Sequence, residues 1–318
     1  MVGVSVISPI YNSSANLKKH LQLLRNLSSK YLIDMEIIIV DTGSTDDSIS
    51  IAEKFADKVL IASGVTRGAA RNLGAQNANR QILVFLDSDC EITENWIRSV
   101  STLPEDLKRR VLGGPVVLDS PKNLLEEPIR NLLLDPLFTF NSSSFSLIRE
   151  STAVKELPTA NLLLSKTFFR EIGGFPDVDF NEDTLFCQKV RKQNGHIVYD
   201  KNLEVIHKHH FLSTLSFSRY FFNYGKKYAN TLMRNPHLIR RYAIIALVAP
   251  FILFTLVFLA TFPSVGTIIG VFSIFSFTGL LIYSFKKFGT LISGLIPGFF
   301  FLLIMSYLGG FYYGLFKK

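Results

Sequence analysis

The last quarter of the chain is almost without charge, and this constrains the fold more than any other feature. Between Tyr242 and Phe316 the only charged residues are Lys286 and Lys287. A water-soluble fold would expose much of such a stretch, so we expect residues 242–318 to form a transmembrane region. A bilayer crossing requires ~20 apolar residues. Spans of that length occur at about 242–262, 265–285 and 290–314.

Basic residues gather just before the apolar stretch. Residues 186–241 contain 11 Lys and Arg but only 2 Asp and Glu. Within them, residues 212–241 mix aromatic and basic side chains, a pattern typical of a helix in the membrane interface. Nucleic acid would be the other partner for a basic patch, but residues 1–185 are acidic overall and contain no groove-reading motif. A membrane is therefore the expected partner, and no nucleic acid is expected.

The positive charges also predict an orientation. Arg240–Arg241 precede the first two spans and Lys286–Lys287 follow them, so both ends of this pair should face the cytoplasm. We therefore expect a multi-pass protein of the inner cell membrane, with a cytoplasmic N-terminal domain at residues 1–211. The third span is ambiguous, because Pro297 would kink it and Lys317–Lys318 oppose a full crossing.

Strand-like and helix-like patterns alternate through the first ninety residues. Four runs rich in β-branched or other apolar residues are predicted to be strands: Val4–Ile10, Glu36–Val40, Lys58–Ala62 and Ile82–Leu86. Helical patterns separate them, and this βαβαβαβ order predicts an α/β fold with a mostly parallel central sheet. Ligands bind beyond the carboxyl ends of the strands in such sheets. Asp41 and Asp87 stand at two of those ends, so a binding site is expected there.

Two carboxylates flank a small residue where the fourth strand ends, in Asp87–Ser88–Asp89. Held at a strand end, such a pair can bind a hard divalent cation and present it to a diphosphate. The cation would neutralise the charge that develops on a departing nucleotide diphosphate. On its own the pattern is weak, because a surface loop with two acids is common.

Further motifs accompany it in a fixed order. Pro9–Ile10–Tyr11–Asn12 closes the first strand, Asp41 closes the second, and Gly68–Ala69–Ala70–Arg71–Asn72 opens the helix before the Asp-x-Asp strand. At this combination the sequence resembles the glycosyltransferase family 2 enzymes, which have the GT-A fold, over about residues 2–210. The resemblance implies a site for a nucleotide-sugar donor, formed by Pro9, Tyr11, Asn12, Asp41, Arg71, Asp87, Ser88 and Asp89.

The resemblance also implies roles within this donor site. Asp41 reads the nucleotide base, Asp87 lies near the ribose, and Asp89 is the principal metal ligand. Arg71 is expected to steady the nucleotide pocket.

A histidine near the end of the N-terminal domain matches a further metal ligand of the resembled family. His207 ends a short predicted strand, and its imidazole beside oxygen ligands would suit Mn²⁺ as well as Mg²⁺. A lone histidine is more often structural, and the neighbouring His209 or His210 could take the role instead. A divalent cation, Mg²⁺ or Mn²⁺, is the expected cofactor.

A second acidic motif, Asn181–Glu182–Asp183, follows Gly173–Gly174–Phe175. In the resembled family the acidic pair at this point supplies the general base. A sugar hydroxyl needs such a base because it is a poor nucleophile until its proton is removed. We assign that role to Asp183, with Glu182 as a supporting acid. Both carboxylates could instead only stabilise the first turn of a helix.

One departure from the family bears on the product. Processive polysaccharide synthases of the group carry a Gln-x-x-Arg-Trp motif well after the acidic pair, whereas the only tryptophan here, Trp96, lies upstream of it. The segment Gln188–Lys189–Val190–Arg191 imitates the first four positions, but it belongs to the helix that directly follows Asp183. Addition of a single sugar is therefore expected rather than polymer synthesis.

Together with the apolar spans, the resemblance thus implies an inverting glycosyltransferase that moves one sugar from a nucleotide-sugar donor to a hydroxyl of a membrane-associated acceptor. A lipid-linked glycan of cell-envelope polysaccharide biosynthesis would be such an acceptor, and Thr159 and Asn161 match a family segment near it. Two alternatives stand beside this one: a catalytically silent membrane-anchored scaffold that binds nucleotide sugars, and a polyprenyl-phosphate glycosyltransferase. An oxidoreductase is disfavoured, because no Gly-x-Gly-x-x-Gly follows the first strand.

Overall fold

The chain divides into two compact units. The first comprises Met1–Ser120 with Asn141–His209, and the second Pro121–Phe140 with His210–Lys318. Residues 121–140, which the sequence grouped with the N-terminal domain, thus fall in the second unit. The computed structural model describes residues 3–104, 107–122, 126–134, 150–178, 181–208, 213–234, 278–283, 286–287 and 295–316.

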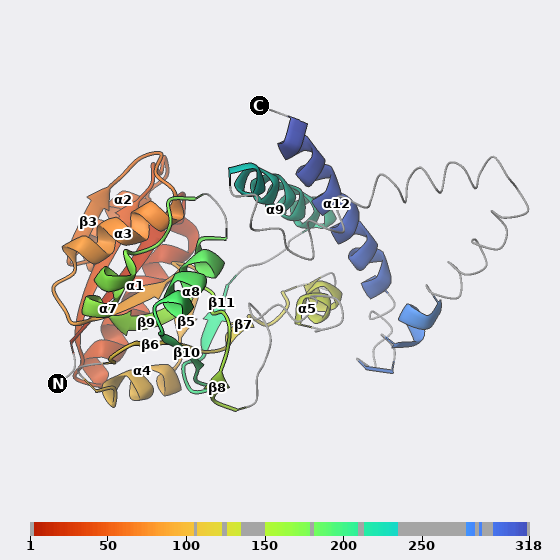
Figure 1. Ribbon diagram of the computed structural model, residues 1–318. Helices are drawn as coiled ribbons and strands as arrows, with labels where there is room; N and C mark the ends of the chain where they lie inside the picture. The colour runs from red at the N-terminus through yellow and green to blue at the C-terminus, as the bar shows by residue number, and fades with distance from the viewer. Residues whose placement is uncertain are drawn as a thin grey trace, which may run out of the picture. The chain divides into compact units, whose positions relative to one another are not determined.

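An eight-stranded sheet forms the centre of the first unit (Figure 1). Its strands are β1 (Gly3–Ile10), β2 (Asp34–Asp41), β3 (Lys58–Ile61), β4 (Ile82–Leu86), β6 (Arg110–Gly113), β8 (Thr152–Ala153), β9 (Asn161–Ser165) and β10 (His196–Tyr199). Their order in space is β3-β2-β1-β4-β9-β6-β10-β8. The strands β3, β2, β1 and β4 pair in parallel, as do β6 and β10, while β9 runs antiparallel between β4 and β6. The predicted α/β fold with a mostly parallel sheet is confirmed.

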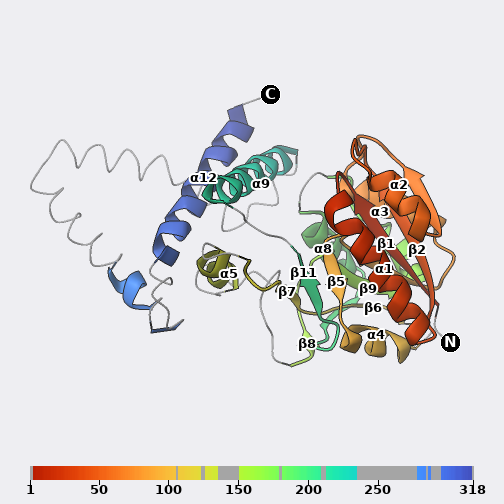
Figure 2. The ribbon, with the colours of Figure 1, turned by 180° about the vertical axis from the view of Figure 1, so that it is seen from behind.

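Helices cover both faces of this sheet. On one face lie α1 (Ser14–Lys30), α2 (Ser48–Phe55) and α4 (Glu94–Ser101), which are in front in Figure 2, and on the other lie α3 (Arg67–Asn77), α7 (Lys166–Ile172) and α8 (Glu182–Lys192). Leu17, Leu21 and Leu24 recur at helical spacing in α1, so they form one stripe that is buried against the sheet. The Thr66 hydroxyl accepts a hydrogen bond from the Ala69 amide and thereby caps α3.

A smaller sheet of three strands lies beside the first, in the order β5-β11-β7. It consists of β5 (Cys90–Ile92), β7 (Val116–Leu118) and β11 (Val205–His207). The sequence predicted only the last of these, as a short strand near the end of the domain. Because β11 pairs antiparallel with β5, His207 lies opposite Cys90, directly after the Asp-x-Asp turn.

The second unit contains the helices α5 (Glu126–Leu134), α9 (Thr214–Arg234) and α12 (Ile296–Phe316). The helix α9 lies in the segment expected at the membrane interface. Within α12, Gly298–Phe316 is long and apolar enough to cross a bilayer, and among the described residues it is the single such helix. It overlaps the third predicted span. The first predicted span and residues 265–277 of the second lie outside the described residues.

Glycines allow α9 and α12 to pack with their backbones in contact. A Cβ at Gly310 would lie 1.7 Å from the carbonyl oxygen of Phe222, and one at Gly314 would lie 2.6 Å from that of Lys226. On the other helix, a Cβ at Gly225 would lie 2.0 Å from the Tyr307 carbonyl oxygen. Small residues four apart on one face are what close packing of apolar helices requires.

This contact predicts a sharp difference between two glycines of α12. Gly310→Ala should lower the free energy of unfolding by about 1–3 kcal/mol, because its methyl group meets a backbone carbonyl that cannot move aside alone. Among the described residues, the methyl group of Gly298→Ala would meet no atom within 4 Å, so this change should be neutral or stabilising by up to about 1 kcal/mol through helix propensity. Thermal unfolding of the detergent-solubilised variants measures both. Equal melting temperatures would contradict the close contact.

Candidate active site

Three neighbouring strands end at the same edge of the large sheet. Because β1 lies in parallel between β2 and β4, their carboxyl ends bring Ile10, Asp41 and Asp87 to that edge. The sequence predicted this convergence from the strand order alone. The other site residues described below lie around this edge of the sheet.

The first two strand-end loops are tied together by polar side chains. The buried Asp41 carboxylate accepts hydrogen bonds from the amides of Gly43 (2.9 Å) and Ser44 (3.0 Å). Asn12, whose φ is 48°, donates its amide to Ser44 Oγ (2.9 Å) and accepts from the Thr45 amide at Oδ1 (2.8 Å). Asp41 and Asn12 thus fix the loop geometry. Beside them, the Tyr11 side chain is exposed and Pro9 is half-buried.

Arg71 joins two acidic motifs that are far apart in the sequence. Its buried guanidinium donates to Asp87 Oδ1 (2.7 Å) and to Glu182 Oε1 (2.9 Å). Burial by itself lowers the pKa of Arg71, but the two carboxylates outweigh burial and raise it. The sequence predicted that Arg71 steadies the nucleotide pocket, but it gave no signal for the contact with Glu182. This bridge connects the strand-end edge of the sheet, at Asp87, to α8.

Two hydrogen bonds from one side chain to the backbone fix the position of the segment before α8. The Asn72 carboxamide accepts from the Phe175 amide (2.9 Å) and donates to the Phe175 carbonyl (2.9 Å). Gly174 is required there, because its φ is +64° and a Cβ would lie 2.6 Å from Asn72 Oδ1. The Phe175 ring then packs on Phe85 and Phe186, with ring centroids 4.9 and 4.4 Å away. These contacts position the first turn of α8.

Asp183 lies in that first turn and carries an unusual carboxyl group. Its pKa is raised to about 7, first by burial, then by the negative charges of Glu182 and Glu156. The Thr184 amide, which donates to Asp183 Oδ1 (2.6 Å), and the charge of Arg71 limit the rise. Close to neutral pH, such a carboxyl group is poised to accept a proton. The sequence did not identify Glu156, whose carboxylate accepts from the Thr184 hydroxyl (3.0 Å).

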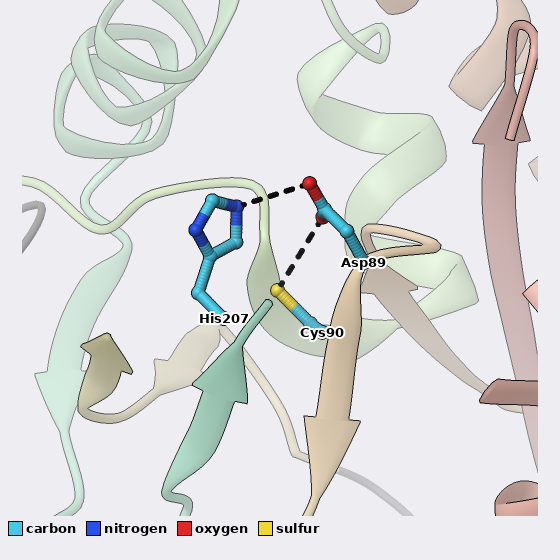
Figure 3. Close-up of side chains that lie close together, drawn as sticks. All are labelled: Asp89, Cys90 and His207. Carbon is cyan, nitrogen blue, oxygen red and sulfur yellow. Dashed lines mark hydrogen bonds and ion pairs between the residues drawn. The ribbon is translucent and has the colours of Figure 1, made fainter. Parts of the chain in front are cut away.

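The small sheet completes a cluster of possible metal ligands around Asp89 (Figure 3). Asp89 Oδ2 lies 3.3 Å from His207 Nε2, and Asp89 Oδ1 lies 4.0 Å from Cys90 Sγ. One ligand atom from each of the three residues lies within 4.8 Å of the other two. Neighbouring ligands of an octahedral ion with bonds of ~2.1 Å are ~3 Å apart. The separation of Asp89 from His207 therefore fits a shared divalent cation.

A buried histidine supports the turn that carries these ligands. The Cys90 amide donates to the Asp87 carbonyl (3.0 Å), and the Cys90 carbonyl accepts from His20 Nδ1 (2.7 Å). Since a carbonyl only accepts, Nδ1 carries the proton, and burial lowers the pKa of His20. The sequence gave no functional signal for His20, because it lies within the apolar stripe of α1 and resembles a core residue.

The remaining predicted residues are mostly enclosed. Asn161 is buried: its Oδ1 accepts from Trp96 Nε1 (3.0 Å), and its amide group donates to the Leu203 carbonyl (2.5 Å). Thr159 and Ser88 are also buried. The Asn161 side chain thus lies in the core, between Trp96 and the Leu203 carbonyl. His209 and His210 lie outside the described residues.

Comparison with known sequences gives consistent matches. A sequence model described as Glycosyl transferase family 2 matches residues 5–156. A glycosyltransferase of Haemophilus influenzae that is named as uncharacterized is 36% identical over 203 residues, which are 62% of this chain and 75% of that protein. Glycosyltransferase AglE of Haloferax volcanii is 29% identical over 55% of this chain and 56% of its own length. For the O-antigen chain rhamnosyltransferase WbaN of Salmonella anatum the values are 26%, 58% and 60%. The chain thus spans little more than half of the latter two relatives.

Two solved structures share the fold. The mannosyltransferase PcManGT from Pyrobaculum calidifontis, in complex with GDP-Man and Mn²⁺, matches 99% of this chain and 87% of its own with a TM-score of 0.62 and 14% identity. Residues 1–349 of TarS from S. aureus, in complex with UDP-GlcNAc, match 72% of this chain and 66% of that chain, with a TM-score of 0.50 and 19% identity. At these identities the likeness establishes the fold alone.

Proposed function

Since the chain belongs to glycosyltransferase family 2 and is a glycosyltransferase with the GT-A fold, we propose that it transfers one sugar from a nucleotide-sugar donor to a hydroxyl of a membrane-associated acceptor, with inversion at the anomeric carbon. One observation carries the proposal. A carboxyl group with a pKa of about 7, on Asp183, is linked through Glu182 and Arg71 to the donor edge at Asp87. Donor and proton acceptor thus belong to one connected site.

The donor half of the proposal rests on the strand-end loops. Asp41 and Asn12 hold the two loops that would receive the nucleotide base, and Asp87 would lie near the ribose. Nucleotide sugars occupy the structures of PcManGT and TarS, which supports the same donor class here.

The metal half rests on Asp89 and His207, whose ligand atoms are 3.3 Å apart. These residues would hold a divalent cation, Mg²⁺ or Mn²⁺. When bound, such a cation neutralises charge on the departing diphosphate. Lys208 donates its amide to the Asp89 carbonyl (2.7 Å), which holds the two ligands in register. The Mn²⁺ in the PcManGT structure supports a metal-assisted reaction.

On the acceptor side, Asp183 rather than Glu182 is suited to remove the hydroxyl proton. Glu182 is bound to the guanidinium of Arg71 at 2.9 Å and would have to give up that ion pair to accept a proton. Asp183 has the raised pKa and no such cationic partner at hydrogen-bonding distance among the described contacts. The hydroxyl oxygen would then attack the anomeric carbon in a single displacement.

A membrane-associated acceptor is the third part of the proposal. It is supported by α12, which is long and apolar enough to cross a bilayer. We place the catalytic domain of residues 1–211 on the cytoplasmic side of a multi-pass membrane protein, as the positive charges favour. An acceptor carried on a lipid would then reach the site along the membrane surface.

Replacement of Asp89 tests the metal role directly. Asp89→Asn should raise the dissociation constant for Mn²⁺ by at least about tenfold and lower transfer by roughly 10²-fold or more. Glu94→Gln is the control, because Glu94 is exposed and paired with Lys30 on the surface, and it should change neither value. Mn²⁺ binding is measured by electron paramagnetic resonance. Unchanged Mn²⁺ affinity in Asp89→Asn would remove Asp89 from the metal site.

A panel of nucleotide sugars tests the function as a whole. Purified full-length protein is incubated with each donor and a membrane extract, with and without Mn²⁺, and the product is analysed by NMR. We expect metal-dependent transfer from one donor with an inverted anomeric configuration. Retention would overturn the single displacement. Tight nucleotide binding with no turnover on any donor would instead favour the scaffold.

A further inference from the structure

Cys90 is the one ligand-bearing residue of the Asp89 cluster that the proposed reaction does not use. Its side chain is buried, and its sulfur faces the Asp89 carboxylate beside the His207 ring (Figure 3). A hard cation such as Mn²⁺ or Mg²⁺ prefers oxygen ligands and has little affinity for sulfur. The Cys90 thiol, which also packs in the hydrophobic core, therefore adds nothing to a site for such a hard cation.

We propose that Asp89, Cys90 and His207 together form a three-ligand site for a borderline transition-metal ion of the Zn²⁺ and Co²⁺ class. This inference rests on the metal position proposed above, since the ion would share Asp89 and His207 with the catalytic cation. It adds a soft ligand, and hence a second class of cation, to that position.

The distances among the three side chains support a tetrahedral ion. Neighbouring ligands of tetrahedral Zn²⁺, with bonds of ~2.0–2.3 Å, are about 3.3–3.6 Å apart. The Asp89–His207 separation is 3.3 Å, the Asp89–Cys90 separation is 4.0 Å, and the three ligand atoms lie within 4.8 Å of one another. To hold one ion, the Cys90 sulfur would have to move closer to the Asp89 carboxylate than its present 4.0 Å. A fourth position would remain for water or a phosphate oxygen.

The backbone fixes this arrangement independently of the side chains. Cys90 and His207 are opposite residues of the β5–β11 pair, so the two side chains leave adjacent strands at the same level. The Cys90 carbonyl is held by His20 and the Asp89 carbonyl by the Lys208 amide, both at 2.7 Å. All three ligands are therefore supplied by one rigid corner of the small sheet, which is what selective metal binding requires.

Binding of such an ion would compete with binding of the catalytic cation. Formation of the metal–sulfur bond displaces the thiol proton to solvent, and the resulting thiolate binds Zn²⁺ and Co²⁺ far better than Mn²⁺. A Zn²⁺ ion held in this way would exclude the catalytic cation from Asp89 and His207. The site would then respond to the supply of zinc relative to manganese.

Cobalt absorption tests the proposal without reference to activity. Co²⁺ is titrated into the purified full-length protein under anaerobic, reducing conditions, and the spectrum is recorded. We expect sulfur-to-cobalt charge transfer in the near ultraviolet and intense visible bands of a tetrahedral ion. Cys90→Ser should lose the charge transfer and raise the Co²⁺ dissociation constant by at least about tenfold. Cys187→Ser is the matched control: it removes the other buried cysteine, whose sulfur faces the Leu157 carbonyl, and it should retain both.

The outcomes separate this inference from the proposed reaction. Wild-type protein that binds Mn²⁺ but gives no charge transfer with Co²⁺ would overturn the cysteine ligand alone, whether or not Cys90→Ser folds. Charge transfer that persists in Cys90→Ser would likewise overturn it. Charge transfer that depends on Cys90, in a protein that does not bind Mn²⁺, would support the three-ligand site and remove the manganese-assisted reaction.

Discussion

Asp183→Asn is expected to lower kcat by about 10²–10⁴-fold while the protein remains folded, because the variant cannot accept the hydroxyl proton. In the wild type the reactive form is the carboxylate. Since the pKa of Asp183 is raised to about 7, kcat should rise with pH through about 7 and level off above it. The variant should lose this pH dependence. Stopped assays across pH 5–9 measure both effects.

The same raised pKa of Asp183 also predicts that the stability of the wild type falls as pH rises, whereas kcat increases. A carboxyl group whose pKa is raised on folding stabilises the fold fully only below its unfolded value, near 3.8, and this contribution is lost as pH rises through about 7. Asp183→Asn cannot ionise, so it should melt at a higher temperature than the wild type at pH 8, and this difference should be smaller at pH 5. Glu171→Gln, an exposed surface change, should do neither. Lower activity together with a lower melting temperature at pH 8 would point to a structural role.

Arg71→Met is expected to destabilise the protein by about 3–5 kcal/mol, because it leaves the carboxylates of Asp87 and Glu182 without their shared cation. Arg71→Lys should restore little, since one ammonium group cannot span both carboxylates as the guanidinium fork does. The double variant Arg71→Met with Glu182→Gln should regain part of the loss, because one buried charge is gone. Denaturant unfolding measures these differences.

A kinetic signature distinguishes this bridge from ordinary packing. The charge of Arg71 lowers the pKa of Asp183, so any residual transfer by Arg71→Met should require a higher pH than in the wild type. Arg80→Met is the control, because Arg80 pairs with Asp34 on the surface, where an ion pair contributes at most about 1 kcal/mol. An unchanged pH profile in Arg71→Met would mean that Arg71 does not act on the base.

The sequence predicted the first half of the sheet well, because long buried strands leave a clear pattern. Observed β1, β2, β3 and β4 differ from their predicted ranges by two residues or fewer at either end. The strands β5 and β7 were missed for physical reasons. Each has three residues, and Gly113–Gly114–Pro115 interrupts the chain just before β7. Such short strands are stabilised by their partners rather than by their own sequence.

The site shows the same division. Residues within local motifs, such as Asp41 and Asp87, could be placed at strand ends from order alone. The contact of Arg71 with Glu182 could not, because it joins residues 111 positions apart and depends on how α3 and α8 dock on one face of the sheet. The role of His20 could not be predicted for another reason. Its side chain binds the backbone carbonyl of Cys90, and every residue has such a carbonyl, so the sequence does not indicate which one is bound.

The pairing of β11 with β5 has a consequence for biosynthesis. The Asp-x-Asp turn leaves the ribosome early, but the strand that brings His207 beside it is made only after the rest of the first unit. A chain that ends before β11 therefore contains Asp41, Asp87 and Asp89 but lacks His207. The cluster that would hold a cation is thus complete only when β11 has paired with β5.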